Sequence, residues 1–322
     1  MSFVRYNPED SVVSSEEVIK GLFSGDVNGL SLFFTSSVSE YYTDVYNASP
    51  STNPSASVQF SAQYGNLYGS GSTWLNASVP GISPTRIVYG QYRNLVYGTE
   101  TTNFTFTNSG VTTTPNGIFI INFARSRYKK ALLPGSITVK LKYNSNALTL
   151  TDDSNTSTVA NFIGENQYYN MVSSGTTYGY LFPNLDIIVL NADKLVSDSF
   201  IASITGSSNT AEYNQNKLII SSATAGIGGT VNSLLAQSDE TVSSRYFFTR
   251  VKNSDFNYTT NPSIIDNNGN LLFSTLINNP QTYVTTVGLY NDNNELLAVA
   301  KLSQPLIKDF TKEALIRIKL DY

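Results

Sequence analysis

Alternation of apolar and polar side chains runs through most of the sequence and predicts most of its elements. A period of two residues is typical of half-buried strands. Short stretches with that period are separated by clusters of Ser, Thr, Asn and Gly. The pattern therefore predicts a mostly β fold, built of sandwich-like antiparallel sheets in two or three lobes, with one or two short helices.

A hairpin over residues 285–305 is the clearest of these elements. Two apolar runs flank residues 291–294, which are Asn and Asp and so tolerate left-handed backbone and bond their own main chain. The return run, residues 295–302, is apolar on both faces for most of its length, so we expect both faces to be covered. Pro305 is expected to end the pairing because proline has no backbone N–H.

The last residues predict a strand that belongs with this hairpin. Ile316, Ile318 and Leu320 share one face at a period of two, and charged residues alternate with them. A short helix over residues 311–322 is the alternative, but the alternation favours a strand. We expect the hairpin and this strand to form one sheet whose apolar face closes the C-terminal lobe.

One helix is predicted near the start of the chain, over residues 14–23. Ser14 or Ser15 can cap it, and two glutamates follow in the first turn, where the helix dipole favours acids. Later, residues 216–222 have the pattern of a strand, and residues 223–237 could hold a second short helix. Tyr-Gly pairs recur between residues 64 and 98, but their spacing is irregular and predicts no repeat architecture.

These patterns suggest three regions. Each has its own composition, and the outer two could pair with each other to form one lobe. The regions are 1–143, a β-rich N-terminal lobe with the early helix; 144–240, a central Ser/Thr/Asn-rich β lobe that could be an insertion; and 241–322, a C-terminal β segment with the hairpin.

Composition narrows the class of protein. The chain has 322 residues, of which 40% are hydrophobic, so it can bury a core, whereas only 14% are charged. The net charge of −4 argues against a nucleic-acid partner. No stretch has the roughly 18 apolar residues of a membrane span. The first residues carry acids and a proline instead of the apolar core of a secretory signal, so synthesis in a cytoplasm without export by that route is expected.

The sequence contains no histidine and no cysteine. It therefore excludes an imidazole general base, a Ser-His-Asp or Cys-His arrangement and a thiolate zinc site. The glycine-rich residues 226–230 lack the spacing and the lysine of a phosphate-binding loop, which favours a turn. We expect a protein that is not an enzyme and that binds no cofactor.

Two acidic patterns leave some room for other chemistry. Asp266, Asn268 and Asn270 fit the first positions of a calcium loop, but Ile277 stands where the loop needs a glutamate. A turn between strands is favoured there, and no metal is expected. The pair at residues 152–153, two aspartates, could supply one acid of a carbohydrate-cleaving pair, although nothing in the sequence identifies the second.

Five residues are candidates for a protein interface. The one basic cluster, residues 124–130, contains a tyrosine; it could contact phosphates or an acidic partner, but a strand end facing a neighbouring subunit is favoured. The 21 tyrosines also suit interfaces or sugar platforms, because a tyrosine offers a large rigid contact area with a polar tip. The candidates are Arg125, Arg127, Tyr128, Tyr290 and Tyr322.

Residues 282–322 resemble the C-terminal segment of virion structural proteins of contractile-tailed bacteriophages of the T4-like, marine type. Four stretches of the N-terminal half are similar to the same group, and the resemblance is weakest over residues 144–240. These stretches read GLFSGDVNGLSLFFTSS, SASVQFSAQYGNLYGSGS, SPTRIVYGQYRNLVYG and RSRYKKALLPGSITVKL.

The resemblance implies a structural role in the virion. The expected function is a baseplate wedge subunit that joins the tail core to peripheral or fibre-bearing parts. It would act through contacts with other tail proteins, in several copies or by self-association. The alternative is a receptor-binding or sugar-binding tail fibre or spike, although spikes commonly show a repetitive β-helix period that this sequence lacks. The resemblance implies no catalytic residue.

Overall fold

The structure is a computed structural model in which 47% of the chain is strand and 13% is helix. The predicted mostly β class with antiparallel sheets is therefore confirmed. The described part of the chain has four α-helices, which is more than the sequence predicted. The described residues are 5–30, 33–35, 41–72, 82–128, 130–157, 159–204, 215–226, 233–257, 261–278 and 280–321.

The chain forms two compact units. Unit 1 comprises Met1–Glu16 and Thr241–Tyr322, and unit 2 comprises Glu17–Glu240. The division predicted near residue 240 coincides with a unit boundary. The division predicted near residue 144 falls inside the turn between two paired strands, and the regions on both sides of it share one sheet.

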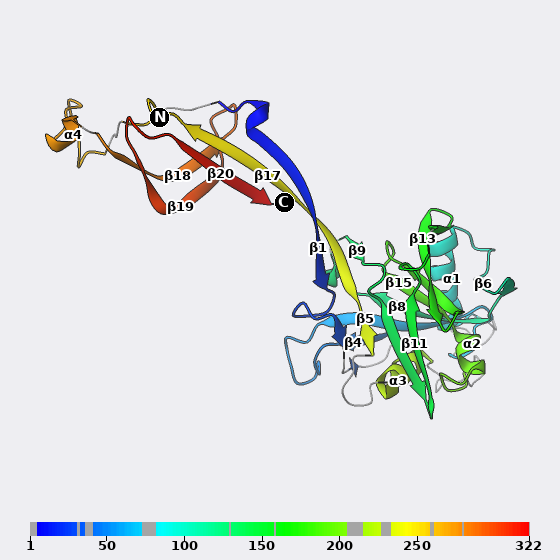
Figure 1. The fold of residues 1–322 in the computed structure, drawn as a ribbon. Coiled ribbons are helices and arrows are strands. Elements are labelled where there is room, and N and C mark those ends of the chain that lie inside the picture. Colours follow the sequence, from blue (N-terminus) through cyan, green and yellow to red (C-terminus); the bar gives the residue numbers. More distant parts are fainter. Residues whose placement is uncertain are drawn as a thin grey trace. The chain divides into compact units, whose positions relative to one another are not determined.

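Unit 2 is built on a twelve-stranded sheet that curls into a half-barrel (Figure 1). The pairings described in this sheet are antiparallel, and a separate hairpin of β6 (Phe106–Asn108) and β7 (Val111–Thr113) accompanies it. The strands in spatial order are β2 (Gly29–Leu30), β16 (Leu234–Leu235), β10 (Thr138–Tyr143), β11 (Asn146–Asp152), β13 (Asn166–Ser173), β14 (Thr176–Phe182), β15 (Ile187–Asn191), β8 (Gly117–Phe123), β5 (Val58–Asn66), β4 (Thr43–Tyr46) and β3 (Phe34–Thr35), with β12 (Asn161–Ile163) on β13.

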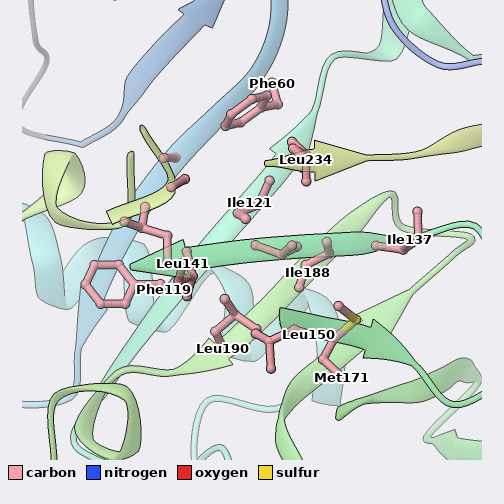
Figure 2. Close-up of a cluster of buried hydrophobic side chains, with 14 of the residues drawn as sticks. Phe60, Phe119, Ile121, Ile137, Leu141, Leu150, Met171, Ile188, Leu190 and Leu234 are labelled. Atoms are coloured by element: carbon pink, nitrogen blue, oxygen red, sulfur yellow. The ribbon is translucent and has the colours of Figure 1, made fainter. Parts of the chain in front are cut away.

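Alternate side chains of the central strand β8 enter two different cores, because successive residues of a strand point to opposite faces. Phe119 and Ile121 enter the larger core inside the curl, which Figure 2 shows. Ile118 and Ile120 enter a second core on the other face. A strand with both faces buried reads as a nearly continuous apolar run, as residues 117–123 do.

Helix α1 (Pro84–Tyr97) covers the second core and was not predicted. Ser83 caps it, and Gly98 ends it in left-handed conformation with φ 67°. Its buried side chains follow the helical period and include Val88 and Tyr92. The Ser-Pro start, the final glycine and this period were available in the sequence, but the recurring Tyr-Gly pairs obscured them.

Two predicted elements are wrong in type. The helix expected over residues 14–23 is strand β1 (Ser11–Gly21), which pairs with β17 (Gln237–Val251). A partner strand from the far end of the sequence outweighs the local capping signal. Residues 216–222, expected as a strand, form the first part of helix α3 (Asn216–Gly226). Of the region 223–237, where a second short helix was expected, only residues 223–226 are helical, as the end of α3, and residues 234–235 form β16.

Tertiary contacts hold helix α3 against the sheet. The Asn216 side chain accepts a hydrogen bond from the Tyr64 backbone N–H at 2.7 Å, and Ile219 and Ala223 are buried in the larger core. Helix α2 (Ala192–Ser197) follows β15 and is capped by the Asn191 side chain. The glycine-rich residues 227–230 lie outside the described part of the chain.

In unit 1, β18 (Thr282–Tyr290) and β19 (Leu296–Lys308) form the predicted hairpin, which is confirmed. Pro305 does not end the pairing, however. It lies in an irregularity where Val284 pairs with Leu306 and Thr286 pairs with Lys301, and the ladder resumes beyond it. A bulge accommodates a proline in a strand because the bulged residues make no ladder bond.

The predicted final strand is β20 (Ala314–Asp321), but it does not join the hairpin sheet. It pairs with β17 in a sheet that also contains β1 and β9 (Ala131–Leu132). The hairpin packs on this sheet instead, through a small core that contains Leu289, Ile316 and Ile318. The expected apolar face of the last strand is thus correct, and the expected single sheet is wrong. The short helix α4 (Thr275–Asn278) completes unit 1.

Candidate interaction surface

The predicted basic cluster lies in the connection between β8 and β9, and its arginines are engaged within the chain. The Arg125 guanidinium lies over the Tyr128 ring, with 4.7 Å between Cζ and the ring centroid. Arg127 Nη1 donates a hydrogen bond to Ser24 Oγ at 2.6 Å. The structure therefore gives three of the predicted interface residues an internal role that positions this connection.

Asp186 joins this cluster and was missed by the sequence analysis. The Tyr128 hydroxyl donates a hydrogen bond to its carboxylate, and the Leu132 backbone N–H donates another. Asp186 is 3% exposed, and among the described residues its Oδ1 has no hydrogen-bond partner. Burial raises the pKa of Asp186 to about 6, which the two hydrogen bonds and the Arg125 charge only partly offset.

The same contact affects Tyr128. Burial, and then its hydrogen bond to Asp186, raises the pKa of Tyr128 to about 12, so the phenol stays protonated and can donate. The sequence offered no signal for this pairing, because Asp186 lies in the turn between β14 and β15 and approaches Tyr128 only after the sheet has formed.

Two ion pairs fix the first residues of β17 within unit 2. Lys130 Nζ lies 2.8 Å from Asp239 Oδ2, and Lys20 Nζ lies 3.1 Å from Glu240 Oε2. The carboxylates are mostly buried and the lysines are partly exposed, so solvent screening keeps the contribution of each pair to stability small. Lys130, the last residue of the predicted basic cluster, is thus also bound to the chain itself.

Tyr290, the fourth candidate, lies at the end of β18 and covers a glycine. A Cβ on Gly288 would lie 2.9 Å from Tyr290 Cε2 and 3.2 Å from Leu296 Cδ1. The tyrosine ring and the leucine side chain therefore lie on the strand surface that Gly288 leaves open, as aromatic residues do beside glycines in sheets. This contact explains the glycine in the first apolar run of the hairpin.

The outward face of the hairpin is largely apolar. The inward side chains pack on the sheet of β17 and β20, whereas Val299 is 58% and Leu296 52% exposed. The expectation that both faces of the return strand are covered therefore fails within the single chain. We define the hairpin face as the outward-facing residues Tyr283, Tyr290, Leu296, Val299, Lys301 and Ile307.

The fifth candidate, Tyr322, lies outside the described residues. Many other tyrosines are core residues instead of surface residues. Tyr64 is buried in the larger core, Tyr89 and Tyr92 are buried between the sheet and α1, and Tyr180 stacks on Phe106 at 4.8 Å between ring centroids. The compositional signal for an interface is therefore in large part a signal for aromatic packing.

Asp152 and Asp153, the two aspartates considered for a carbohydrate-cleaving pair, accept hydrogen bonds from neighbouring segments. Asp152 Oδ1 accepts a hydrogen bond from the Gly135 backbone N–H at 2.7 Å, and Asp152 Oδ2 accepts one from the Ile137 N–H at 3.2 Å. The Asp153 carboxylate accepts two hydrogen bonds from Asn170, one from its backbone and one from its side chain. Carboxylates used in this way tie the end of β11 to the residues just before β10 and to the middle of β13.

Asp266 lies in the turn that the sequence favoured over a calcium loop. Its Oδ1 accepts hydrogen bonds from the backbone N–H groups of Asn268 and Asn270, both at 2.8 Å. Gly269 has φ 84°, the left-handed conformation that such a turn requires. Among the described residues no group of three or more acidic side chains is placed to hold a metal ion.

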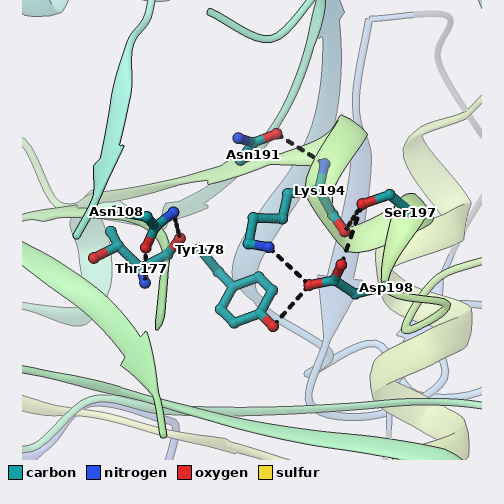
Figure 3. Close-up of polar contacts among 7 residues, drawn as sticks. All are labelled: Asn108, Thr177, Tyr178, Asn191, Lys194, Ser197 and Asp198. Carbon is teal, nitrogen blue, oxygen red and sulfur yellow. Dashed lines mark hydrogen bonds and ion pairs between the residues drawn. The ribbon is translucent and has the colours of Figure 1, made fainter. Parts of the chain in front are cut away.

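A polar cluster joins α2 to β14 in unit 2 (Figure 3). Lys194 Nζ and the Tyr178 hydroxyl both donate hydrogen bonds to Asp198 Oδ2, at 3.0 Å and 2.9 Å. Burial pushes the pKa of Asp198 up, but these two bonds outweigh it and hold the pKa below its ordinary value. Burial also raises the pKa of Tyr178 to about 12, so this cluster holds one negative and one positive charge at neutral pH.

The interior of unit 2 contains a cavity of about 10 Å³, lined by Phe60, Ile121 and Ser233 among others. This volume corresponds to about one water molecule. In the part of the chain that the structure describes, no helix is long and apolar enough to cross a membrane. Searches of family models, curated proteins and solved structures found no significant match to this chain.

Proposed function

We propose that this protein is a structural component of a phage tail, a baseplate wedge subunit that joins the tail core to peripheral or fibre-bearing parts. The sequence resemblance supports the choice of assembly, and its most specific stretch is the hairpin segment over residues 282–322. The structural observation that carries the proposal is that this hairpin presents an apolar face to the outside. Contiguous exposed apolar surface marks sites of protein–protein contact.

The architecture of unit 1 supports an assembly role. Its buried core contains Val251, Leu289, Ile316 and Ile318, few residues for a segment of this length. Small cores give marginal stability, which contacts with neighbouring subunits can raise by mass action. In this proposal the protein acts in the virion, through other tail proteins and further copies of itself.

We also propose that the protein has no catalytic role. The sequence lacks histidine and cysteine, and both aspartates of the pair at residues 152–153 serve as hydrogen-bond acceptors for neighbouring loops. Incubation with capsule or lipopolysaccharide of the host should release no oligosaccharide. Release of sugar would favour the alternative, a tail spike that binds or cleaves a surface receptor.

The decisive experiment is electron cryomicroscopy of purified particles of the phage that encodes this chain, with mass spectrometry of the same preparation. We expect the chain among the virion proteins and both units to fit density in the baseplate. Density at a fibre tip would instead favour the receptor-binding alternative, and absence of the chain from the particles would overturn the proposal.

A further inference from the structure

The two outward surfaces of unit 1 differ in chemistry. The sheet of β17 and β20 turns charged side chains outward: Arg250 pairs with Glu313 at 2.9 Å, Lys319 pairs with Asp321 at 3.1 Å, and Arg317 lies over the Tyr246 ring. Such a surface is typical of an antiparallel sheet that faces water, where polar residues alternate with the buried ones. This surface is predominantly polar, with Leu315 as its one large exposed apolar side chain on β20.

The hairpin face departs from that pattern. Val299 and Leu296 are adjacent to the ring of Tyr290 on one half of it, and Tyr283 pairs with Ile307 across the other half. All five side chains are at least 38% exposed. The polar alternation expected of a solvated strand face is replaced here by apolar and aromatic side chains, which are enriched at the centre of interfaces.

Charges of opposite sign lie at the two ends of the half of the hairpin face that adjoins the turn. Asp292 and Glu295 stand in the turn, and Lys301 points outward on the return strand opposite Thr286. Six residues of strand separate Glu295 from Lys301, which corresponds to about 20 Å. The midpoint between the two charges lies beside Val299, in the half of the hairpin face that contains Leu296 and Tyr290.

This arrangement is complementary to itself under a two-fold rotation. If two hairpin faces are stacked in antiparallel orientation, the acidic turn of each lies over the lysine of the other, and the apolar side chains between these charges, which include Leu296 and Val299, meet. A two-fold interface uses the same patch on both subunits and so requires self-complementarity of this kind. A parallel stacking would instead place lysine over lysine.

We propose that the hairpin face binds the hairpin face of a second copy of this chain, with Glu295 of each copy beside Lys301 of the other. The inference deepens the proposed assembly function and rests on it, because it names one partner and one surface through which that function acts. Face-to-face packing of two sheets about 10 Å apart is a common way to bury apolar sheet surface.

The size of the face sets the strength of this contact. In this orientation the two faces overlap from the turn to Lys301, about 20 Å, and two strands are about 10 Å wide. The face thus buries a few hundred Å² on each copy, less than the roughly 800 Å² per partner of stable complexes. We therefore expect weak, concentration-dependent dimers of the free protein.

Sedimentation velocity of the full chain over a concentration series tests the inference. The wild-type chain should dimerise between about 1 µM and 0.5 mM. Val299→Glu places a charge at the centre of the overlap between the two copies and should raise the concentration at half-dimerisation at least about tenfold. Leu315→Glu is the matched control: it makes the same change at a 67% exposed leucine of unit 1 outside the hairpin face, and it should leave dimerisation unchanged.

Charge-reversal variants test whether the partner of the hairpin face is a second copy of this chain. Glu295→Lys and Lys301→Glu should each weaken self-association about tenfold or more, because each places like charges together. The double variant should restore it, and so should mixing the two single variants, which forms the matched heterodimer. Only a second copy in the antiparallel orientation gives both rescues. Thermal melts of each variant check that unit 1 is folded, since the Glu295 side chain also accepts a hydrogen bond from Asn291.

A monomer up to about 0.5 mM, equal effects of Val299→Glu and Leu315→Glu, or failure of both rescues would overturn the inference. These outcomes differ from failure of the proposed function. A chain found in the baseplate but monomeric in solution retains the function and loses the inference. A chain that dimerises as described but is absent from particles retains the inference and loses the function.

Discussion

Gly65 of β5 and Tyr89 of α1 meet through their backbones. A Cβ added to Gly65 would lie 2.9 Å from the backbone nitrogen of Tyr89 and 3.0 Å from its Cα. The helix thus lies directly on the strand, and the Tyr89 ring reaches the second core, where it packs edge-on against Phe104 with 5.5 Å between ring centroids. Only glycine at residue 65 allows this approach.

Gly65→Ala should therefore destabilise unit 2, by about 1–3 kcal/mol, because backbone atoms must move to admit the methyl group. Gly90→Ala is the matched control in the adjacent helix. A Cβ on Gly90 meets no atom within 4 Å, so alanine should raise helix propensity and stabilise the protein by about 1 kcal/mol. Urea denaturation of both variants measures the two effects. Equal effects would contradict the close approach of α1.

The buried Asp186 predicts a pH dependence of stability. Its folded pKa of about 6 lies above its ordinary value of 3.8, so the folded state holds this proton more tightly than the unfolded state does. Its contribution is complete below about pH 4 and is lost as the pH rises through about 6. Two pKa units correspond to about 3 kcal/mol, which is an upper limit for this contribution.

Asp186→Asn removes the titration and keeps the size of the side chain. The free energy of unfolding of the variant relative to wild type should increase by up to about 3 kcal/mol between pH 4 and pH 7. Tyr128→Phe is a companion variant. It removes a hydrogen bond that lowers the Asp186 pKa, so the carboxyl should titrate at higher pH in an NMR titration. A parallel pH profile of Asp186→Asn and wild type would contradict this assignment.

Tyr92 joins α1 to the sheet through its hydroxyl. The oxygen accepts hydrogen bonds from Gln63 Nε2 at 2.8 Å and from Asn122 Nδ2 at 3.2 Å. Tyr92→Phe leaves both amides without this acceptor in a buried site, so it should cost about 1–3 kcal/mol of unfolding free energy. Tyr68→Phe, at a 66% exposed tyrosine, should change stability by less than about 0.5 kcal/mol. Thermal melts of the pair test the difference.

Residues on the two faces of β20 should differ in how much they contribute to the stability of unit 1. Ile318 is buried in the small core of unit 1, so Ile318→Ala should destabilise that unit by about 2–5 kcal/mol. Leu315 on the opposite face is largely exposed, and Leu315→Ala should be close to neutral. Hydrogen exchange of the amides of β17 and β20 reports on unit 1 separately from unit 2. Similar exchange in both variants would mean that β20 does not close this core.

Local pattern alone predicted the elements whose partners are near in sequence. The hairpin of β18 and β19 needs only two apolar runs and a turn of Asn and Asp residues, and it forms where expected. The turn at Asp266 is likewise local, because its carboxylate binds backbone groups within four residues. The apolar face of β20 follows from alternation.

Prediction failed where a distant partner decides the outcome. Residues 14–21 carry a capping signal for a helix but form a strand, because β17 supplies a hydrogen-bonding partner from the other end of the chain. Residues 216–222 alternate like a strand but form a helix, because Ile219 and Ala223 fill the curl of the sheet. In α3 burial overrides the local preference, whereas β1 is mostly exposed and is held by its backbone pairing with β17.

For the candidate interface residues too, some features follow from the sequence and others depend on tertiary contacts. The sequence by itself determined the mostly β class, the hairpin and the apolar side chains of its return strand. Only the tertiary structure decided that the half-buried Tyr128 bonds to Asp186 with the exposed Arg125 over its ring, whereas Val299 stays exposed on the hairpin face. Alternation states which side chains share a face of a strand, but which face is covered depends on what packs against it, and that is settled by long-range contacts.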